Sequence, residues 1–153
     1  MKVLLDTNIL IDYWCCRQPF FNDVLKLRVA EFFNDIELWS SGKTFTDAEY
    51  ILSRVGCSSE VRTVLRESLR FLNIAMPVVT DLEEGLTADW EDLEDFLIAK
   101  CAERIKADYI LTRDKTGFIQ SKIPVLEPKE FLLLLKDKYG CEYDVFDFPN
   151  SPS

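Results

Sequence analysis

The stretch KVLLDTNILID at residues 2–12 decides how the chain folds. Residues 2–5 are a short apolar run that stops at an acid, which predicts a buried parallel strand ending at Asp6. Thr7 and Asn8 then favour the start of a helix. A carboxylate between a central strand and a helix lies in the crevice where open α/β sheets bind ligands. Taken alone, Asp6 could equally be only the cap of that helix.

The rest of the chain alternates between the hydrophobic patterns of strands and helices. This alternation predicts an α/β protein, a three-layer sandwich whose central parallel sheet has about five strands. We expect residues 1–138 to form one domain and residues 139–153, which mix acids, aromatics, Pro and Ser, to form a C-terminal tail. The expected strands are 2–6, 36–39, 75–79, 109–111 and 123–126, the expected helices are 9–17, 20–34, 44–55, 59–72, 81–86, 90–107 and 129–138, and a turn is expected at 40–42.

The composition narrows the chemistry. The 153 residues include no histidine, which excludes Ser-His-Asp and Cys-His nucleophilic sites, histidine general bases and most zinc sites. Hydrolysis would have to rely on carboxylates, which usually act by holding hard cations. The net charge of −9 disfavours nucleic acid as a simple electrostatic partner, although acids gathered around divalent ions would account for part of it.

Acids recur where a ligand site is expected. Asp6 ends the first strand, Asp114 follows the strand at 109–111, and Asp92 and Asp95 lie in the first turns of the long helix. Each acid alone is better explained by a solvated helix face or by the helix dipole. Together in one crevice they would repel each other unless cations neutralised them. The set therefore predicts a centre of one or two Mg²⁺ or Mn²⁺ ions that could act on a phosphodiester.

A further acid follows the second strand, and two residues compete for the role. Asp47 lies three residues after Thr44 and four before Ile51, which places it beside the apolar face of the helix expected at 44–55. Glu49 lies on the opposite side. We therefore expect Asp47 to point into the site and Glu49 to be solvated.

These motifs together resemble the PIN domain family, including the VapC-type toxins of bacterial toxin–antitoxin pairs. The resemblance rests on LLDTNILID at 4–12, DLEDFLIA at 92–99, ADYILTRD at 107–114 and IPVLEPKEF at 123–131, and it covers roughly residues 1–135. It implies a parallel, Rossmann-like sheet between helices and a Mg²⁺- or Mn²⁺-dependent endoribonuclease acting on single-stranded RNA. It also implies a possible toxin role, an antitoxin partner and a homodimer.

Position by position, the resemblance implies a role for each residue. The acidic quartet would be Asp6, Asp47, Asp95 and Asp114; the metal ligands would be Asp6, Asp95, Asp114 and Asp92; the polar supports would be Thr7, Asn8 and Thr112. The sequence departs from the family in two places. The second acid is often Glu in the family, and Gly117-Phe118 stands where an Asp-Phe pair often follows the last acid.

Two other functions remain open at this point. One is a phosphatase with Asp6 as the nucleophile, although such enzymes usually need Asp-x-Asp, and position 8 is Asn. The other is a PIN-like binding module without catalysis. A basic rim for RNA could come from Lys43, Arg54, Lys100, Arg104, Arg113 and Lys115.

Location and assembly are expected from simpler features. No signal peptide or membrane span is evident, and five cysteines without a Cys-x-x-Cys pair favour reduced thiols, so we expect a cytoplasmic protein. The homodimer interface is expected in the helices between Ile9 and Phe33, whose apolar residues exceed what one sheet face needs.

Overall fold

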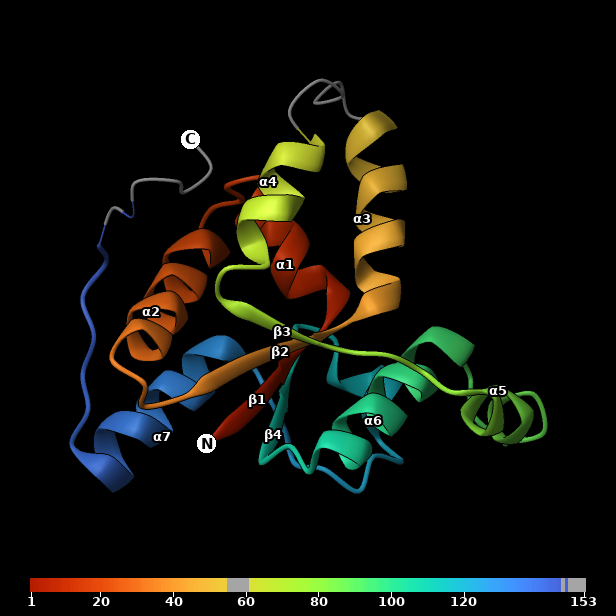
Figure 1. The fold of residues 1–153 in the computed structure, drawn as a ribbon. Coiled ribbons are helices and arrows are strands. Elements are labelled where there is room, and N and C mark those ends of the chain that lie inside the picture. Colours follow the sequence, from red (N-terminus) through yellow and green to blue (C-terminus); the bar gives the residue numbers. More distant parts are fainter. Residues whose placement is uncertain (55–60, 147, 149–153) are drawn as a thin grey trace.

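A five-stranded parallel sheet forms the centre of the protein (Figure 1). The computed structural model describes residues 1–54, 61–146 and 148. Within them the strands lie in the order β3-β2-β1-β4-β5, and every neighbouring pair is parallel. The expected α/β sandwich is therefore confirmed. The strands are β1 (Lys2–Leu5), β2 (Glu37–Ser41), β3 (Leu72–Ala75), β4 (Tyr109–Leu111) and β5 (Val125–Leu126).

Helices cover both faces of this sheet (Figure 1). Val3 and Leu5 of β1 pack into one core with α1, α2, α3, α4 and α7, whereas Leu4, between them, packs into a second core with α6. This alternation is the period of two that a strand imposes. The helices are α1 (Thr7–Trp14), α2 (Phe20–Phe32), α3 (Gly42–Arg54), α4 (Val61–Ser68), α5 (Val79–Gly85), α6 (Leu93–Ile105) and α7 (Pro128–Tyr139), with a 3₁₀ helix, η1, at Lys115–Phe118.

Several expected strand boundaries are wrong. β1 ends at Leu5 rather than at Asp6, and β5 begins at Val125 rather than at residue 123. Residues 40 and 41 are not a turn but the end of β2, where Ser40 and Ser41 are buried. α3 begins directly at Gly42, where an added Cβ would lie 2.0 Å from the Met76 sulfur, so glycine allows this close approach. The third strand is Leu72–Ala75 rather than 75–79, because the polar Asn73 hid its start within the apolar pattern.

Helix limits also differ from expectation. α6 begins at Leu93 rather than at residue 90, and α4 ends at Ser68 rather than at residue 72. The expected end of α3, at residue 55, and the expected start of α4, at residue 59, lie outside the described residues. No helix in the described part of the chain is long and apolar enough to cross a membrane.

Most apolar residues of α1 and α2 are buried within the protein. Seven of the eight residues of α1 are buried, and Trp14 donates its indole N–H to Ser68 Oγ over 2.8 Å. The exposed aromatic residues of this region lie at the two ends of α2, where Phe20 is 38% exposed and Phe32 and the following Phe33 are 65% and 63% exposed. The apolar excess between Ile9 and Phe33 therefore does not by itself require a dimer interface.

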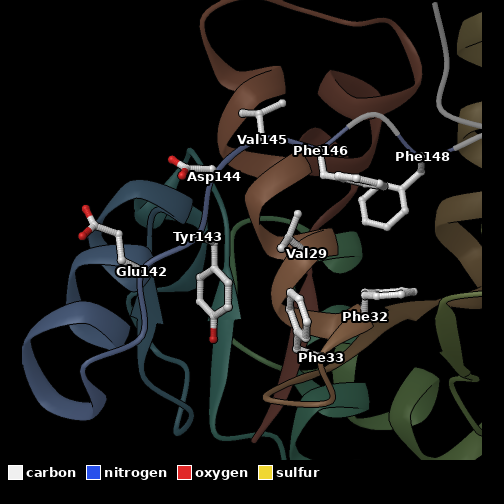
Figure 2. Close-up of a pocket in the computed structure, with 9 residues that line it drawn as sticks. All are labelled: Val29, Phe32, Phe33, Glu142, Tyr143, Asp144, Val145, Phe146 and Phe148. Carbon is white, nitrogen blue, oxygen red and sulfur yellow. The ribbon is translucent and has the colours of Figure 1, made fainter.

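The C-terminal tail runs beside α2 (Figure 1). A cavity of about 320 Å³ lies between them. Its lining, drawn in Figure 2, consists mainly of apolar and aromatic side chains of both segments. The Tyr143 hydroxyl donates to Asp35 over 2.8 Å, and Phe148 packs against Phe32. Phe146 contacts Phe148 but is 60% exposed. None of the acids expected in the site lines this cavity.

Candidate functional site

Asp6 lies at the carboxyl end of the central strand and is held there from several sides. Its backbone N–H donates to the Leu111 carbonyl over 3.0 Å, which fixes it beside the end of β4. Its side chain, only 5% exposed, accepts hydrogen bonds from the Thr7 N–H at 2.6 Å, Asn8 Nδ2 at 2.6 Å and Thr112 Oγ1 at 2.7 Å. Asp6 is thus the N-cap of α1 and also a member of a larger polar cluster.

The surroundings of Asp6 disfavour its charged form. Burial raises the pKa of Asp6 to about 6, and the negative charges of Glu94 and Asp114 add to this rise. The hydrogen bonds from Thr112 and Thr7 oppose it but do not cancel it. Among the described residues, Asp6 has acidic neighbours and no ion pair with a basic side chain, and a buried carboxyl in such surroundings gains strongly from a bound cation.

The start of α6 brings two more acids to this point. Asp92 is the N-cap, and its Oδ1 accepts the Glu94 N–H over 2.6 Å. Asp95 lies in the first turn and is half-buried. Burial raises the pKa of Asp95 to about 7, and the charges of Asp6, Asp92, Glu94 and Asp114 contribute to this rise. Four neighbouring acids therefore disfavour the charged form of Asp95.

Asp114 completes this group from the loop after β4. Its N–H donates to Thr112 Oγ1 over 3.0 Å, so the hydroxyl that contacts Asp6 also contacts Asp114. Asp114 is exposed and caps η1, accepting from both the hydroxyl and the N–H of Thr116. These hydrogen bonds, that of the Thr116 hydroxyl first, lower the pKa of Asp114 below its usual range.

The departure from the family at Gly117 has a steric reason. A Cβ added to Gly117 would lie 2.1 Å from Asp95 Oδ2, so the backbone of η1 passes directly against the Asp95 carboxyl. Trp90, which precedes α6, donates its indole N–H to the Gly117 carbonyl over 2.9 Å and holds this approach. Phe118, the next residue, is buried in the second core. A side chain at position 117 would therefore displace Asp95.

Asp47 is connected to the acidic cluster by the side chain of Lys43. Lys43, one turn earlier in α3, pairs with Asp47 and also with Glu94 Oε2, the latter over 3.1 Å. Although partial burial opposes it, hydrogen bonds and charge from Asp47 and Glu94 raise the pKa of Lys43. Glu49, in contrast, pairs with the exposed Arg62 over 2.6 Å. Asp47 therefore faces the acids and Glu49 faces away, which is the helix phase expected from the sequence.

The structure thus brings together Asp6, Asp92, Asp95 and Asp114, with Asp47 at the edge. The three expected supports, Thr7, Asn8 and Thr112, each contact the cluster. Whether these residues bind metal or take part in a reaction stays a prediction. Sequence reasoning missed Glu94, whose Oε1 accepts from Thr7 Oγ1 over 3.1 Å. Its position one residue before Asp95, at a helix start, was the available signal.

The expected basic rim is not a set of free charges. Lys100 pairs with Glu84, Arg104 with Asp81, and Lys115 with Glu130, while Arg54 stacks on Tyr50. Arg113 lies with its Nε 2.7 Å from Oδ2 of the fully buried Asp12 and stacks on Phe20. With Lys43, which pairs with Asp47 and Glu94, all six residues of the expected rim thus have partners within the chain.

The donor set fits a hard divalent cation, because all its charged members are carboxylates. Among the described residues, no three acid or cysteine side chains are already arranged to hold a metal ion. Protein donors occupy these carboxylates: hydroxyl and amide groups on Asp6, Thr116 on Asp114, and Lys43 on Asp47 and Glu94. Asp6 and Asp95, with raised pKa values, are the members that most need a cation.

Comparison with known proteins now identifies the family. The sequence pattern of the PIN domain matches residues 2–116, which is most of the chain and includes every acid of the cluster. The chain belongs to the PIN domain family. A comparison with curated proteins gives no match.

Solved structures show the same fold. The chain is similar to VapBC2 from Rickettsia felis, bound to a DNA fragment of its promoter, with 18% identity, a TM-score of 0.60, and coverage of 83% of this chain and 98% of that one. It is similar to VapBC-1 from nontypeable Haemophilus influenzae, with 17% identity, a TM-score of 0.60, and coverage of 84% and 99%. It is also similar to a toxin–antitoxin complex from Klebsiella pneumoniae, with 24% identity, a TM-score of 0.57, and coverage of 82% and 97%.

Proposed function

We propose that this PIN domain is an endoribonuclease that hydrolyses phosphodiester bonds of single-stranded RNA with Mg²⁺ or Mn²⁺. The observation that carries the proposal is the pair Asp6 and Asp95, two buried or half-buried carboxyls whose pKa values are raised to about 6 and about 7 beside further acids. Groups perturbed in this way gather at functional sites more often than elsewhere. Their charged forms become favourable when a divalent cation neutralises them.

In this proposal Asp6, Asp95 and Asp114 hold the metal, with Asp92 beside them. A bound ion supplies Lewis-acid stabilisation of the charge that develops at the phosphodiester. Thr112 orients Asp6 and Asp114 at the same time, and Asn8 donates to both Asp6 and Thr112. Gly117 leaves room for the Asp95 carboxyl. Asp47 lies at the edge of the site as the fourth acid of the quartet.

The phosphatase alternative is less well supported. Such an enzyme would need a second carboxyl at position 8, whereas Asn8 donates its side-chain amide to Asp6 Oδ2. An amide in that position orients Asp6 and cannot act as a general acid. A PIN-like binding module without catalysis remains the second candidate, because the paired basic residues leave little free positive charge for RNA.

We further propose that the protein is the toxin of a toxin–antitoxin pair, acting in the cytoplasm as a homodimer held by an antitoxin. Support comes from the structural neighbours, which are named VapBC or toxin–antitoxin complexes. The exposed Phe32 and Phe33 at the end of α2 offer apolar surface for such contacts. Light scattering at high protein concentration tests the dimer, and a strictly monomeric mass would contradict it.

Cleavage of a single-stranded RNA tests the enzymatic proposal. We expect cleavage with Mg²⁺ or Mn²⁺ and loss of cleavage in EDTA. We also expect the Asp6→Asn variant to cleave about a hundred- to a thousandfold more slowly, which is the scale of removing one charge-stabilising group. Asp108→Asn is the matched control, since Asp108 lies at the opposite end of β4 and accepts from the Lys2 N–H. Cleavage that survives EDTA, or is unchanged in Asp6→Asn, would refute the proposed metal-dependent enzyme. Absence of cleavage under all these conditions would leave the binding module.

A further inference from the structure

Lys43 lies inside the acidic cluster rather than on a basic rim around it. Its ammonium contacts Asp47 on its own helix and Glu94 at the start of α6, so it joins two elements that are far apart in the sequence. Its side chain is 35% exposed, and those of Asp47 and Glu94 are 29% and 34% exposed. The contact therefore lies partly out of water, where charges act on one another more strongly than at the open surface.

The environment of this lysine is unlike that of an ordinary surface ion pair. Glu94 also accepts from Thr7 Oγ1 over 3.1 Å, and Thr7 Oγ1 lies 3.0 Å from Thr44 Oγ1. Thr7 in turn donates its N–H to Asp6. A continuous polar network thus leads from Lys43 to the central carboxyl of the site. Glu94 is also one of the charges that disfavour ionisation of both Asp6 and Asp95.

We propose that Lys43, through its contacts with Asp47 and Glu94, is the built-in counter-ion of this site and competes electrostatically with the divalent cation for the negative charge of the acidic cluster. In the metal-free protein its ammonium offsets part of the repulsion among the acids. When the cation binds, it takes over that role, and the lysine must give up some of its contact. Lys43 is a positioning residue in this view, and its charge lowers the affinity of the site for metal. The inference rests on the proposed metal dependence.

A purely structural role predicts the opposite sign. If Lys43 only held Asp47 in place, removing its charge would loosen the acid and weaken metal binding. If Lys43 competes with the metal, removing its charge leaves the acids more negative and strengthens binding. The two roles are therefore separated by the direction of one measured affinity.

The experiment measures Mn²⁺ binding by calorimetry to metal-stripped protein. We expect Lys43→Met to bind Mn²⁺ about tenfold more tightly than the wild type, since loss of one nearby positive charge is of this order in partly buried sites. Lys43→Arg, which keeps the charge, should bind within about twofold of the wild type. Lys136→Met removes an equivalent lysine, paired with Glu142 outside the site, and should also leave the affinity unchanged.

Thermal unfolding gives a second readout that needs no metal. Metal-free Lys43→Met should unfold a few degrees lower than the wild type, because the acids lose their counter-ion. Saturating Mn²⁺ should close this gap, and Lys136→Met should show neither effect. Lys43→Gln repeats the test with a side chain that still donates hydrogen bonds, in case the methionine variant folds poorly.

The outcomes distinguish this inference from the proposed function. Wild-type binding of Mn²⁺ together with unchanged or weaker binding by both Lys43→Met and Lys43→Gln would overturn the role of Lys43 alone. Failure of the wild type and every variant to bind Mn²⁺ would overturn the proposed metal dependence, and the inference with it. Tighter binding by the uncharged variants, with wild-type affinity in Lys43→Arg, would support both.

Discussion

Asp6 and Asp12, at the two ends of one turn-and-helix segment, are both almost fully buried, yet their surroundings differ. Asp12 is 0% exposed and has Arg113 Nε 2.7 Å from Oδ2 and Arg17 Nη1 3.9 Å from Oδ1. Asp6 is 5% exposed and has hydroxyl and amide donors and acidic neighbours.

The difference separates an acid that is neutralised within the chain from one that we propose binds a cation. Burial raises the pKa of Asp12, but the charges of Arg113 and Arg17 oppose the rise. At Asp6 only hydrogen bonds oppose it, and neighbouring acids add to it. Two arginines of the chain thus act as counter-ions of Asp12, whereas the described neighbours of Asp6 compensate its charge only through hydrogen bonds. A buried acid whose cation is absent from the protein indicates a binding site more strongly than burial alone does.

The largest effect on stability is expected from breaking the ion pair between Arg113 and Asp12. Arg113→Met leaves the buried Asp12 without its nearest cation and removes the stacking on Phe20. Removal of one partner of a buried ion pair costs about 3 kcal/mol, which lowers the melting temperature by about 6–10 °C in a domain of this size. Thermal unfolding measures the loss.

Arg62→Met is the matched control for this change. Arg62 also pairs with an acid, Glu49, but its side chain is 87% exposed. Its removal should change the free energy of unfolding by less than about 0.5 kcal/mol, as exposed pairs usually do. Equal effects of the two substitutions would mean that the Asp12 pair is no more important than a surface contact, and the comparison would fail.

A smaller effect on stability is expected from the charging of Asp6 and Asp95, which have no counter-ion comparable to Arg113 among the described residues. Their pKa values in the folded protein, about 6 and about 7, lie above the ordinary value of 3.8, so the folded state binds protons that the unfolded state has already lost. The stability of the metal-free protein should therefore fall as the pH rises from about 4 to about 7 and level off above that. Melting temperatures across this range measure the fall.

Two changes should reduce this pH dependence. Asp6→Asn removes one of the two titrating groups, and saturating Mg²⁺ or Mn²⁺ favours the charged carboxylates. We expect the variant to be at least as stable as the wild type at pH 7.5 without metal. A metal-free wild type that gains stability steadily between pH 5 and pH 7.5 would show that these acids are already neutralised within the chain.

The sequence predicted the sheet and the placement of the main acids because both follow from local rules. The carboxyl ends of parallel strands meet at one edge, so Asp6 and Asp114 had to come together, and helix periodicity separated Asp47 from Glu49. The boundaries of β2 and β3 were missed because small or polar residues, Ser40, Ser41 and Asn73, interrupt the apolar pattern within these strands.

The ion pairs between different elements could not be predicted, since they depend on which helix packs beside which. Lys43 and Arg113 both stood among the residues expected on a basic rim, and both instead contact acids from other elements. Glu94 was missed for the same reason, because its role comes from Thr7 and Lys43, which lie far away in the sequence. Sequence patterns give the positions of charges along an element, but the partner of each charge is a tertiary property.

The smallest expected difference concerns Asp47 and Glu49, two acids on one helix that each have a basic partner. Lys43 links Asp47 to Glu94 and the polar network around Asp6, whereas the Arg62 side chain, which pairs with Glu49, is 87% exposed. If the surroundings of an ion pair decide its role, only the Asp47 charge should matter to the site.

We expect Asp47→Asn to reduce metal-dependent RNA cleavage about tenfold or more and Glu49→Gln to leave it within about twofold, as surface changes usually do. Cleavage rates of the two variants, measured side by side at saturating metal, test this. Loss of activity in Glu49→Gln with normal activity in Asp47→Asn would show that this helix presents its other face to the substrate, and the assignment of the second acid would move to Glu49.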